Sequence, residues 1–180
     1  MEGENQATPV EPVPHAGGEG EVDPRKIERF LDELRREQNL PLGVAGGVIG
    51  AVLGAGTWVG ITAATHYQIG WMAVAVGFLV GLGVRILGKG IDKVFGYVGA
   101  ILSLVGCLAG NLLMVCIFVA HHDGVPVGQV LSELTPDEAI RMLKATFSTM
   151  DLVFYAIAVY EGYRFSFRQV TAKDVGRIAT

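Results

Sequence analysis

The sequence predicts an all-α, polytopic membrane protein: four transmembrane helices, an N-terminal amphipathic helix and a long, partly protruding last helix. Of the 180 residues, 51% are apolar and 18% are charged. Residues 40–84 and residues 94–120 contain no Asp, Glu, Lys or Arg, and about 20 apolar residues suffice to cross a bilayer. Glycine supplies 25 residues, more than a soluble domain of this length usually carries.

Two N-terminal segments precede the membrane part. Residues 1–22 contain five glutamates, three prolines and no Lys or Arg, so we expect a disordered acidic tail. Within residues 23–39, apolar residues recur from Ile27 to Leu34 at the spacing of one helix face. We predict an amphipathic helix that lies on the membrane surface or docks on its neighbours. A cytoplasmic partner for this helix or for the tail is the alternative.

The four spans and their connections follow from the apolar runs. We predict spans at residues 42–65, 69–87, 94–120 and 147–163, which make up a transmembrane domain over residues 42–168. An external segment covers residues 121–146, and residues 169–180 form a cytoplasmic tail.

The last helix has the clearest start signal in the chain. Thr135-Pro136-Asp137-Glu138 predicts a capping box with proline at the first helical position. The helix is expected to run unbroken from Pro136 to about Arg168, which at about 1.5 Å per residue exceeds one membrane thickness. Its first part is therefore expected to protrude.

Basic residues set the orientation. With four spans, twelve Lys and Arg residues fall on one side and two on the other. The twelve are Arg25, Lys26, Arg29, Arg35, Arg36, Arg85, Lys89, Lys93, Arg164, Arg168, Lys173 and Arg177, and the two are Arg141 and Lys144. Because the side richer in Lys and Arg faces the cytoplasm, both termini are predicted to be cytoplasmic. Three spans would move the four C-terminal basic residues outside and spoil this pattern.

Glycines in the spans recur at the spacing of helix-packing motifs. The eleven are Gly43, Gly46, Gly47, Gly50, Gly54, Gly56, Gly60, Gly77, Gly81, Gly106 and Gly110. Helices in lipid associate through close backbone packing over small residues. One small four-helix bundle hardly needs so many such positions, so we expect those left over to meet other protomers.

The second span ends in a basic, glycine-rich turn. Gly83 and Gly88-Lys89-Gly90 approach the phosphate-binding P-loop pattern, but Gly90 stands where a metal-binding Ser or Thr is required. We instead expect Arg85, Lys89 and Lys93 to meet anionic lipid headgroups. No basic patch with interleaved aromatic residues is present, so a nucleic-acid partner is not expected.

Three polar residues fall inside the predicted membrane region: Asn111, Asp151 and Tyr155. Asn111 and Tyr155 lie at similar depth, so they can hydrogen-bond across helices. Asp151 is either a helix-end residue that reaches water, or it pairs with one of the histidines at the outer side or, as we favour, with another protomer. Hydrogen bonds that hold helices together are the simpler explanation. The alternative is a polar path for a solute. Glu161 and Arg164 are expected to form an ion pair at the helix end.

Histidines gather on the predicted outer side. His66, His121 and His122, with Asp123, could bind zinc or copper, but polar residues also commonly end a span. We therefore predict no metal site and no cofactor. Cys107 and Cys116 fall on opposite faces of one helix and are expected to be apolar fillers.

The segments GWMAVAVGFLVGLGVRILGKGIDKVFGYVGAILSLVGCLAGNLL and FYAIAVYEGYRFSFR resemble a family of small uncharacterised bacterial inner-membrane proteins. In that family a GFLVG–GKG–GN series crosses two helices, and an EGYRFSFR-like end closes the last one. Some members carry a zinc ribbon or a proline-rich segment ahead of the membrane part. The resemblance covers residues 42–168. It implies a four-helix protein of the bacterial inner membrane and supplies no catalytic residue.

Together these features predict a non-enzymatic membrane scaffold that forms homo-oligomers through glycine-rich helix faces. A subunit of an oligomeric channel or transporter, with a polar path near Asn111, Asp151 and Tyr155, is the alternative. An enzyme with a metal at the outer face ranks third, because no nucleophile–base pair or carboxylate dyad accompanies these residues.

Overall fold

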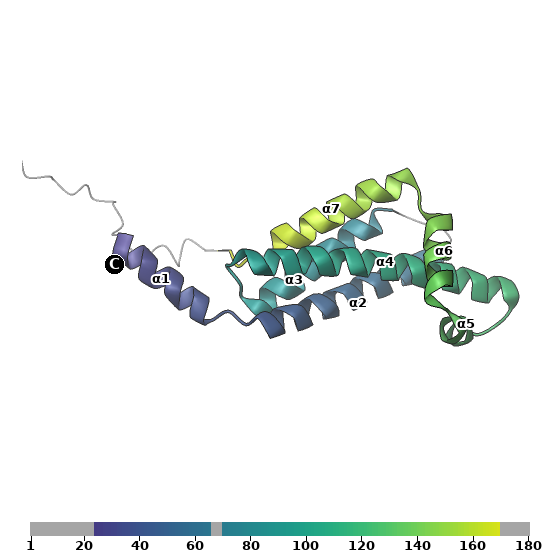
Figure 1. Cartoon of the computed structure of the whole chain (residues 1–180), viewed down its shortest axis with the longest axis horizontal. Coiled ribbons are helices and arrows are strands. Elements are labelled where there is room, and N and C mark those ends of the chain that lie inside the picture. Colours follow the sequence, from purple (N-terminus) through teal and green to yellow (C-terminus); the bar gives the residue numbers. More distant parts are fainter. Residues whose placement is uncertain (1–23, 66–69, 170–180) are drawn as a thin grey trace, which may run out of the picture.

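The computed structural model describes residues 24–65 and 70–169, and these residues form seven α-helices and no strand (Figure 1). The helices are α1 (Pro24–Arg36), α2 (Leu40–Thr65), α3 (Met72–Gly88), α4 (Lys93–Asp123), α5 (Val127–Glu133), α6 (Pro136–Thr146) and α7 (Thr149–Phe165). Helices α2, α3, α4 and α7 form an elongated bundle, with α1 at one end and α5 and α6 at the other. The all-α class is confirmed for these residues.

Local signals in the sequence explain where the two longest helices begin and end. The Asn39 side-chain oxygen accepts a hydrogen bond from the Leu42 N–H at 3.0 Å and caps the start of α2. Pro41 lies in the first turn, where its missing N–H costs nothing. At the far end of α4, Gly124 adopts a φ of 67° and its N–H bonds to the Ala120 carbonyl. This left-handed conformation favours glycine.

Helices α2 and α3 pack antiparallel with their backbones in contact. Gly46 faces Gly83, and a Cβ added to either residue would collide with the carbonyl oxygen of the other. The register continues toward the α5–α6 end, where a Cβ added to Gly54 would lie 3.0 Å from the Val76 Cα. Glycine therefore sets the distance between these two helices.

Helices α3 and α4 are the central elements of the bundle, because each contacts the other and both α2 and α7. Val76, Val80 and Val84 lie on the inner side of α3 and are fully buried. Helix α7 packs against both α3 and α4, and Gly77 of α3 faces the backbone of Ala158 in α7. The bundle thus closes around small and β-branched side chains.

The predicted unbroken last helix is wrong. The capping box at Thr135 and Glu138 does start a helix, but α6 ends at Thr146 and the axis of α7 is turned by 107° from it. A second capping box makes the break: the Ser148 side chain accepts from the Asp151 N–H, and the Asp151 carboxylate accepts from the Ser148 N–H at 2.8 Å. This cap satisfies backbone groups that a continuous helix would otherwise pair.

Two helices are long and apolar enough to cross a membrane. In the most apolar 18-residue window, 28% of the residues are buried inside the molecule in α2 and 39% in α4, so most residues of each window are not buried by the protein itself. The bent pair of α6 and α7 counts as a third candidate span if it is taken as one broken span. Helix α3 is apolar but has 17 residues. These helices are consistent with a membrane protein.

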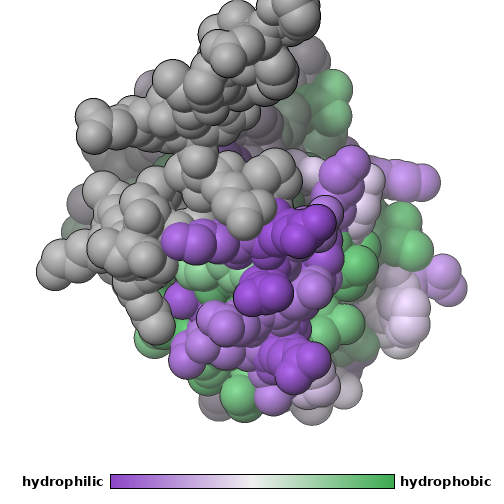
Figure 2. All heavy atoms as spheres, turned by 90° about the vertical axis from the view of Figure 1, so that its left-hand side faces the viewer, coloured by the Kyte–Doolittle hydropathy of each residue, from purple (hydrophilic) through white to green (hydrophobic). Residues whose placement is uncertain are grey.

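A polar junction joins three chain segments at the α1 end of the bundle. The Gln38 side-chain oxygen accepts from the N–H groups of Ile91 and Asp92 at 3.0 and 3.1 Å. The Arg168 N–H donates to the Gly90 carbonyl at 2.8 Å, and its guanidinium contacts Glu37 at 2.7 Å. Figure 2 shows hydrophilic residues gathered on this end, with hydrophobic ones at the rim.

Other predicted segments are described in part or not at all. Residue Leu34 of α1 is buried, whereas Ile27 is 40% exposed. The predicted external segment, residues 121–146, contains α5, which has no buried residue. The acidic tail (residues 1–22), the turn with His66 and most of the C-terminal tail lie outside the described residues.

Candidate functional site: polar groups and glycines of the bundle

Asn111 and Tyr155 meet between α4 and α7. Asn111 is 2% exposed and Tyr155 is 5% exposed. The Asn111 side chain hydrogen-bonds the Tyr155 hydroxyl, which also lies 3.4 Å from the Cys107 carbonyl oxygen. The contact expected from their similar depth is therefore present. This contact holds α4 and α7 together through hydrogen bonds between buried polar groups.

Asp151 does not join this pair. It lies one turn earlier on α7, is half-buried, and its carboxylate accepts from the Ser148 N–H at 2.8 Å and from the Ser148 hydroxyl at 3.0 Å. The partner expected on another helix or protomer is thus found in the same chain, three residues away. Asp151 is a helix-capping residue, and it does not extend the Asn111–Tyr155 contact into a line of polar groups.

The eleven predicted packing glycines divide into two groups. Nine are used inside the bundle, because a Cβ added to each would lie within 4 Å of another helix of the same chain. These nine are Gly43, Gly46, Gly47, Gly50, Gly54, Gly77, Gly81, Gly106 and Gly110. The other two, Gly56 and Gly60, have no atom within 4 Å of an added Cβ. The expected surplus of glycines is therefore confined to one pair on α2.

Helices α4 and α7 are joined by a reciprocal contact that the sequence analysis missed. A Cβ on Gly99 would collide with the Ser166 hydroxyl, and a Cβ on Gly162 would collide with the Ser103 hydroxyl. Both serines donate to the carbonyl four residues earlier, Ser103 to Gly99 at 2.7 Å and Ser166 to Gly162 at 2.6 Å. The sequence does contain a signal for this contact: a Gly and a Ser lie four residues apart on both helices, which is a small-xxx-small packing motif.

The outward side of α2 toward the α5–α6 end carries small residues. Gly56, Gly60, Ala63 and Ala64 are exposed there, and we call them the small-residue face. The exposed residues elsewhere on α2, α4 and α7 are mostly large and apolar; Val52 of α2, Ile101 of α4 and Leu152 of α7, for example, are 66%, 62% and 60% exposed. The small-residue face differs from these surfaces in having almost no side-chain bulk.

The basic turn between α3 and α4 lies at the α1 end. Arg85 is half-buried, and Lys89 and Lys93 are exposed. Lys89 adopts a left-handed φ of 48°, and its N–H bonds to the Arg85 carbonyl at 3.0 Å. Among the described residues, none of these three side chains takes part in the four ion pairs.

The expected ion pair between Glu161 and Arg164 is not formed. Arg164 instead donates to the Tyr160 hydroxyl at 3.2 Å, and its guanidinium lies 5.9 Å from the centre of that ring. A position four residues earlier on the helix is as close as one three residues earlier, so the aromatic side chain competes with the carboxylate.

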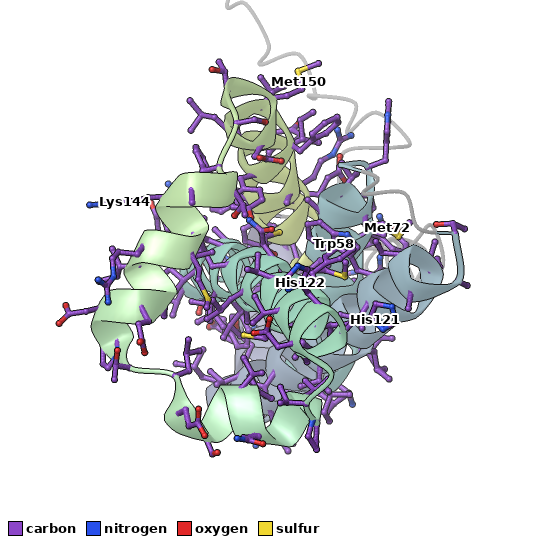
Figure 3. The ribbon with its side chains drawn as sticks, turned by 90° about the vertical axis from the view of Figure 1, so that its right-hand side faces the viewer. Trp58, Met72, His121, His122, Lys144 and Met150 are labelled. Atoms are coloured by element: carbon purple, nitrogen blue, oxygen red, sulfur yellow. The ribbon has the colours of Figure 1, made fainter. Side chains whose placement is uncertain are left out.

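His121 and His122 lie at the end of α4 and are exposed (Figure 3). The His122 ring nitrogen lies 2.8 Å from the Asp123 carboxylate. In the described part of the chain, no three His, Cys, Asp or Glu side chains come together as metal ligands. Cys107 and Cys116 are both buried free thiols.

Comparison with known proteins does not assign this chain to a family. No family model, no curated protein and no solved structure matches it.

Proposed function

We propose that the chain is a non-enzymatic, four-span membrane protein that forms homo-oligomers through the small-residue face of α2 and acts as a membrane scaffold. The observation that carries the proposal is the pair Gly56 and Gly60: among the described residues, no atom lies within 4 Å of a Cβ added to either glycine. Glycine destabilises a helix by about 1 kcal/mol relative to alanine. Two exposed glycines in α2 therefore cost helix stability without a compensating contact inside the bundle. A second copy of the chain that packs on this face supplies such a contact, because small residues let two helices approach closely.

Support for four spans comes from length and charge. At about 1.5 Å per residue, the 17 residues of α3 and the 17 of α7 reach about 25 Å each, close to the hydrocarbon thickness. Of the twelve Lys and Arg in the described chain, ten belong to the α1 end, and Arg141 and Lys144 of α6 belong to the other. We therefore assign the α1 end and both termini to the cytoplasm.

The proposed surroundings follow from this orientation. Arg85, Lys89 and Lys93 face anionic headgroups of the cytoplasmic leaflet. Helix α1 extends from the same end (Figure 1), where it meets the membrane surface or a cytoplasmic partner. A bacterial inner membrane is the proposed location, as the family resemblance of the sequence implies.

The geometry favours a scaffold over a channel subunit. Asn111 and Tyr155 use their polar groups on each other and on the Cys107 carbonyl, while Asp151 caps its own helix. Three cavities in the described part of the chain, of about 260, 180 and 380 Å³, lie toward the α5–α6 end, and none of the three is lined by these residues. A solute path needs polar groups that the solute can reach. The buried Asn111–Tyr155 contact therefore fits a role in holding α4 and α7 together better than a role in transport.

Cysteine cross-linking in native membranes tests the proposed contact. Thr57→Cys adds a thiol beside the small-residue face and should give disulfide-linked dimers on mild oxidation. Ile101→Cys adds one to the exposed side of α4, where 62% of the residue is accessible, and serves as the matched control. Equal cross-linking at both positions, or none at Thr57→Cys, contradicts the proposal.

A further inference from the structure

Helix α6 lies across the bundle and not along it. Its axis is turned by 107° from that of α7, which packs lengthwise against α3 and α4. Figure 1 shows α6 crossing α4, and Figure 3, viewed from the α5–α6 end, shows α6 at one side of the bundle. With the four spans upright in a membrane, as proposed above, α6 lies parallel to the membrane surface.

One line of apolar side chains on α6 points toward the membrane interior. Phe147 ends the helix, and its N–H still bonds to the Leu143 carbonyl at 3.0 Å. The Phe147 ring packs edge-on against Tyr155, in the second turn of α7, with 5.8 Å between the ring centres. Because α7 runs from there toward the α1 end, this contact fixes the direction of Phe147. Ile140 lies on the same line two turns earlier, and 50% of it is exposed.

The remaining sides of α6 differ from this apolar line. Met142 is half-buried on the side toward α4, the helix that α6 contacts. Arg141 and Lys144 are exposed, and Figure 3 shows Lys144 pointing away from the bundle. Ala145 is exposed on nearly the opposite side of the helix from Ile140. Helix α6 therefore has an apolar edge toward the membrane interior and a cationic edge at the level of its own axis.

The two cations of α6 are placed to share an anion. Neither Arg141 nor Lys144 belongs to the four ion pairs of the described residues. Glu138, three residues before Arg141, already accepts from the Thr135 N–H and hydroxyl at 2.9 and 2.7 Å. Like charges three residues apart on a helix repel each other, so an anion that lies between them is favoured. A lipid phosphate at the membrane surface is such an anion.

We propose that α6 is an interfacial helix that binds the outer leaflet of the membrane. Ile140 and Phe147 enter the acyl region, and Arg141 and Lys144 bind lipid phosphates. A helix bound in this way lies about 5–10 Å into the boundary between headgroups and acyl chains. The inference rests on the membrane placement under the proposed function and not on self-association, since α6 takes no part in the small-residue face of α2.

Spin labels on the full chain in lipid nanodiscs measure the depth of α6. Ile140→Cys and Ala145→Cys place the label on opposite sides of the helix. Cys107 and Cys116 are buried, so wild type serves as the labelling blank. Oxygen collects in the acyl region and a water-soluble nickel complex stays outside, so relaxation by the two reagents reports depth. We expect the Ile140 label about 5–10 Å below the phosphates, and the Ala145 label at their level or above.

A lipid exchange tests the cationic edge of α6. Replacing half of the dioleoyl-phosphatidylcholine by dioleoyl-phosphatidylglycerol should move the Ile140 label deeper, because an anionic surface attracts basic side chains. The double variant Arg141→Gln, Lys144→Gln should lose this shift. The matched pair Arg25→Gln, Lys26→Gln, in α1 at the other end of the molecule, should keep it.

A label at Ile101→Cys, on the exposed side of α4, separates this inference from the proposed membrane placement. If oxygen reaches the Ile101 label and nickel reaches the Ile140 label, the α6 proposal is overturned and the spans stand. If nickel reaches the Ile101 label, both are overturned. An Ile140 label that neither reagent reaches lies under protein, which contradicts the lipid contact. A lipid-dependent shift that wild type lacks, or that survives Arg141→Gln with Lys144→Gln, contradicts phosphate binding.

Discussion

Gly46 of α2 and Gly83 of α3 pack backbone against backbone, each filling the space where a Cβ of the other would point. Replacing Gly46 by alanine forces the carbonyl of Gly83 away and separates the helices. We expect Gly46→Ala to destabilise the bundle by about 1–3 kcal/mol, although alanine alone favours a helix. The measurement is unfolding in mixed micelles.

Gly128→Ala is the control for this change. Gly128 is also helical, in α5, but a Cβ there meets nothing within 4 Å. It should leave stability unchanged or raise it slightly. If Gly46→Ala behaves like Gly128→Ala, the close approach of α2 and α3 does not hold the bundle together.

Asp151 should matter through helix capping. Asp151→Ala removes the acceptor for the Ser148 N–H and is expected to cost about 0.5–2 kcal/mol of stability. Asp151→Asn keeps a side-chain oxygen at this position and should cost less. Both variants should retain the oligomer mass of wild type. Loss of the oligomer in Asp151→Asn, without loss of monomer stability, would instead place this residue in a contact between protomers.

The capping box of α6 makes a prediction about pH. The Thr135 N–H donates to the Glu138 carboxylate at 2.9 Å and lowers the pKa of that carboxyl below its ordinary value. A lowered pKa contributes stability that is present above the ordinary pKa and is lost as the pH falls through the folded-state value. Acidification should therefore loosen α6.

Carbon NMR of the Glu138 carboxyl measures this effect in the full chain. Thr135→Pro removes the backbone N–H and should return the pKa of Glu138 toward its ordinary value. Glu138→Gln should make the helicity of α6 insensitive to acid. An unchanged Glu138 titration in Thr135→Pro shows that the backbone hydrogen bond does not set the pKa.

The topology prediction follows from the basic residues at the α1 end. Reporters fused after Glu21 and after Thr180 should both read as cytoplasmic, and a reporter inserted at Gly124 should read as external. An external C-terminal reporter would remove α7 as a span and leave an odd number of crossings.

The sequence predicted the positions of the helices well because charge-free runs are long and their ends are polar. Predicted spans at 42–65 and 94–120 correspond to α2 (Leu40–Thr65) and α4 (Lys93–Asp123). The break before α7 was missed although Ser148 and Asp151 have the spacing of a capping box. An apolar pattern compatible with a continuous helix runs across this point and competes with the capping box. The sequence alone does not decide between them, whereas the bend between α6 and α7 shows that the capping box ends the helix.

The use of the glycines could not be predicted, because it depends on the register between helices. Gly46 and Gly60 both occur at the spacing of helix-packing motifs. A Cβ added to Gly46 would collide with Gly83, whereas one added to Gly60 meets no described atom within 4 Å. Depth along a span is easier to count, which is why the contact of Asn111 with Tyr155 was foreseen.

The mass of the assembly in native lipid nanodiscs tests the central claim most directly. Wild type should appear as an oligomer, and the double variant Gly56→Leu, Gly60→Leu should appear as a folded monomer, because two leucines hold a second copy away. Ala109→Leu, a similar change at an exposed position of α4, should leave the oligomer intact. A monomeric wild type, or a double variant with the wild-type oligomer mass, would contradict assembly through the small-residue face.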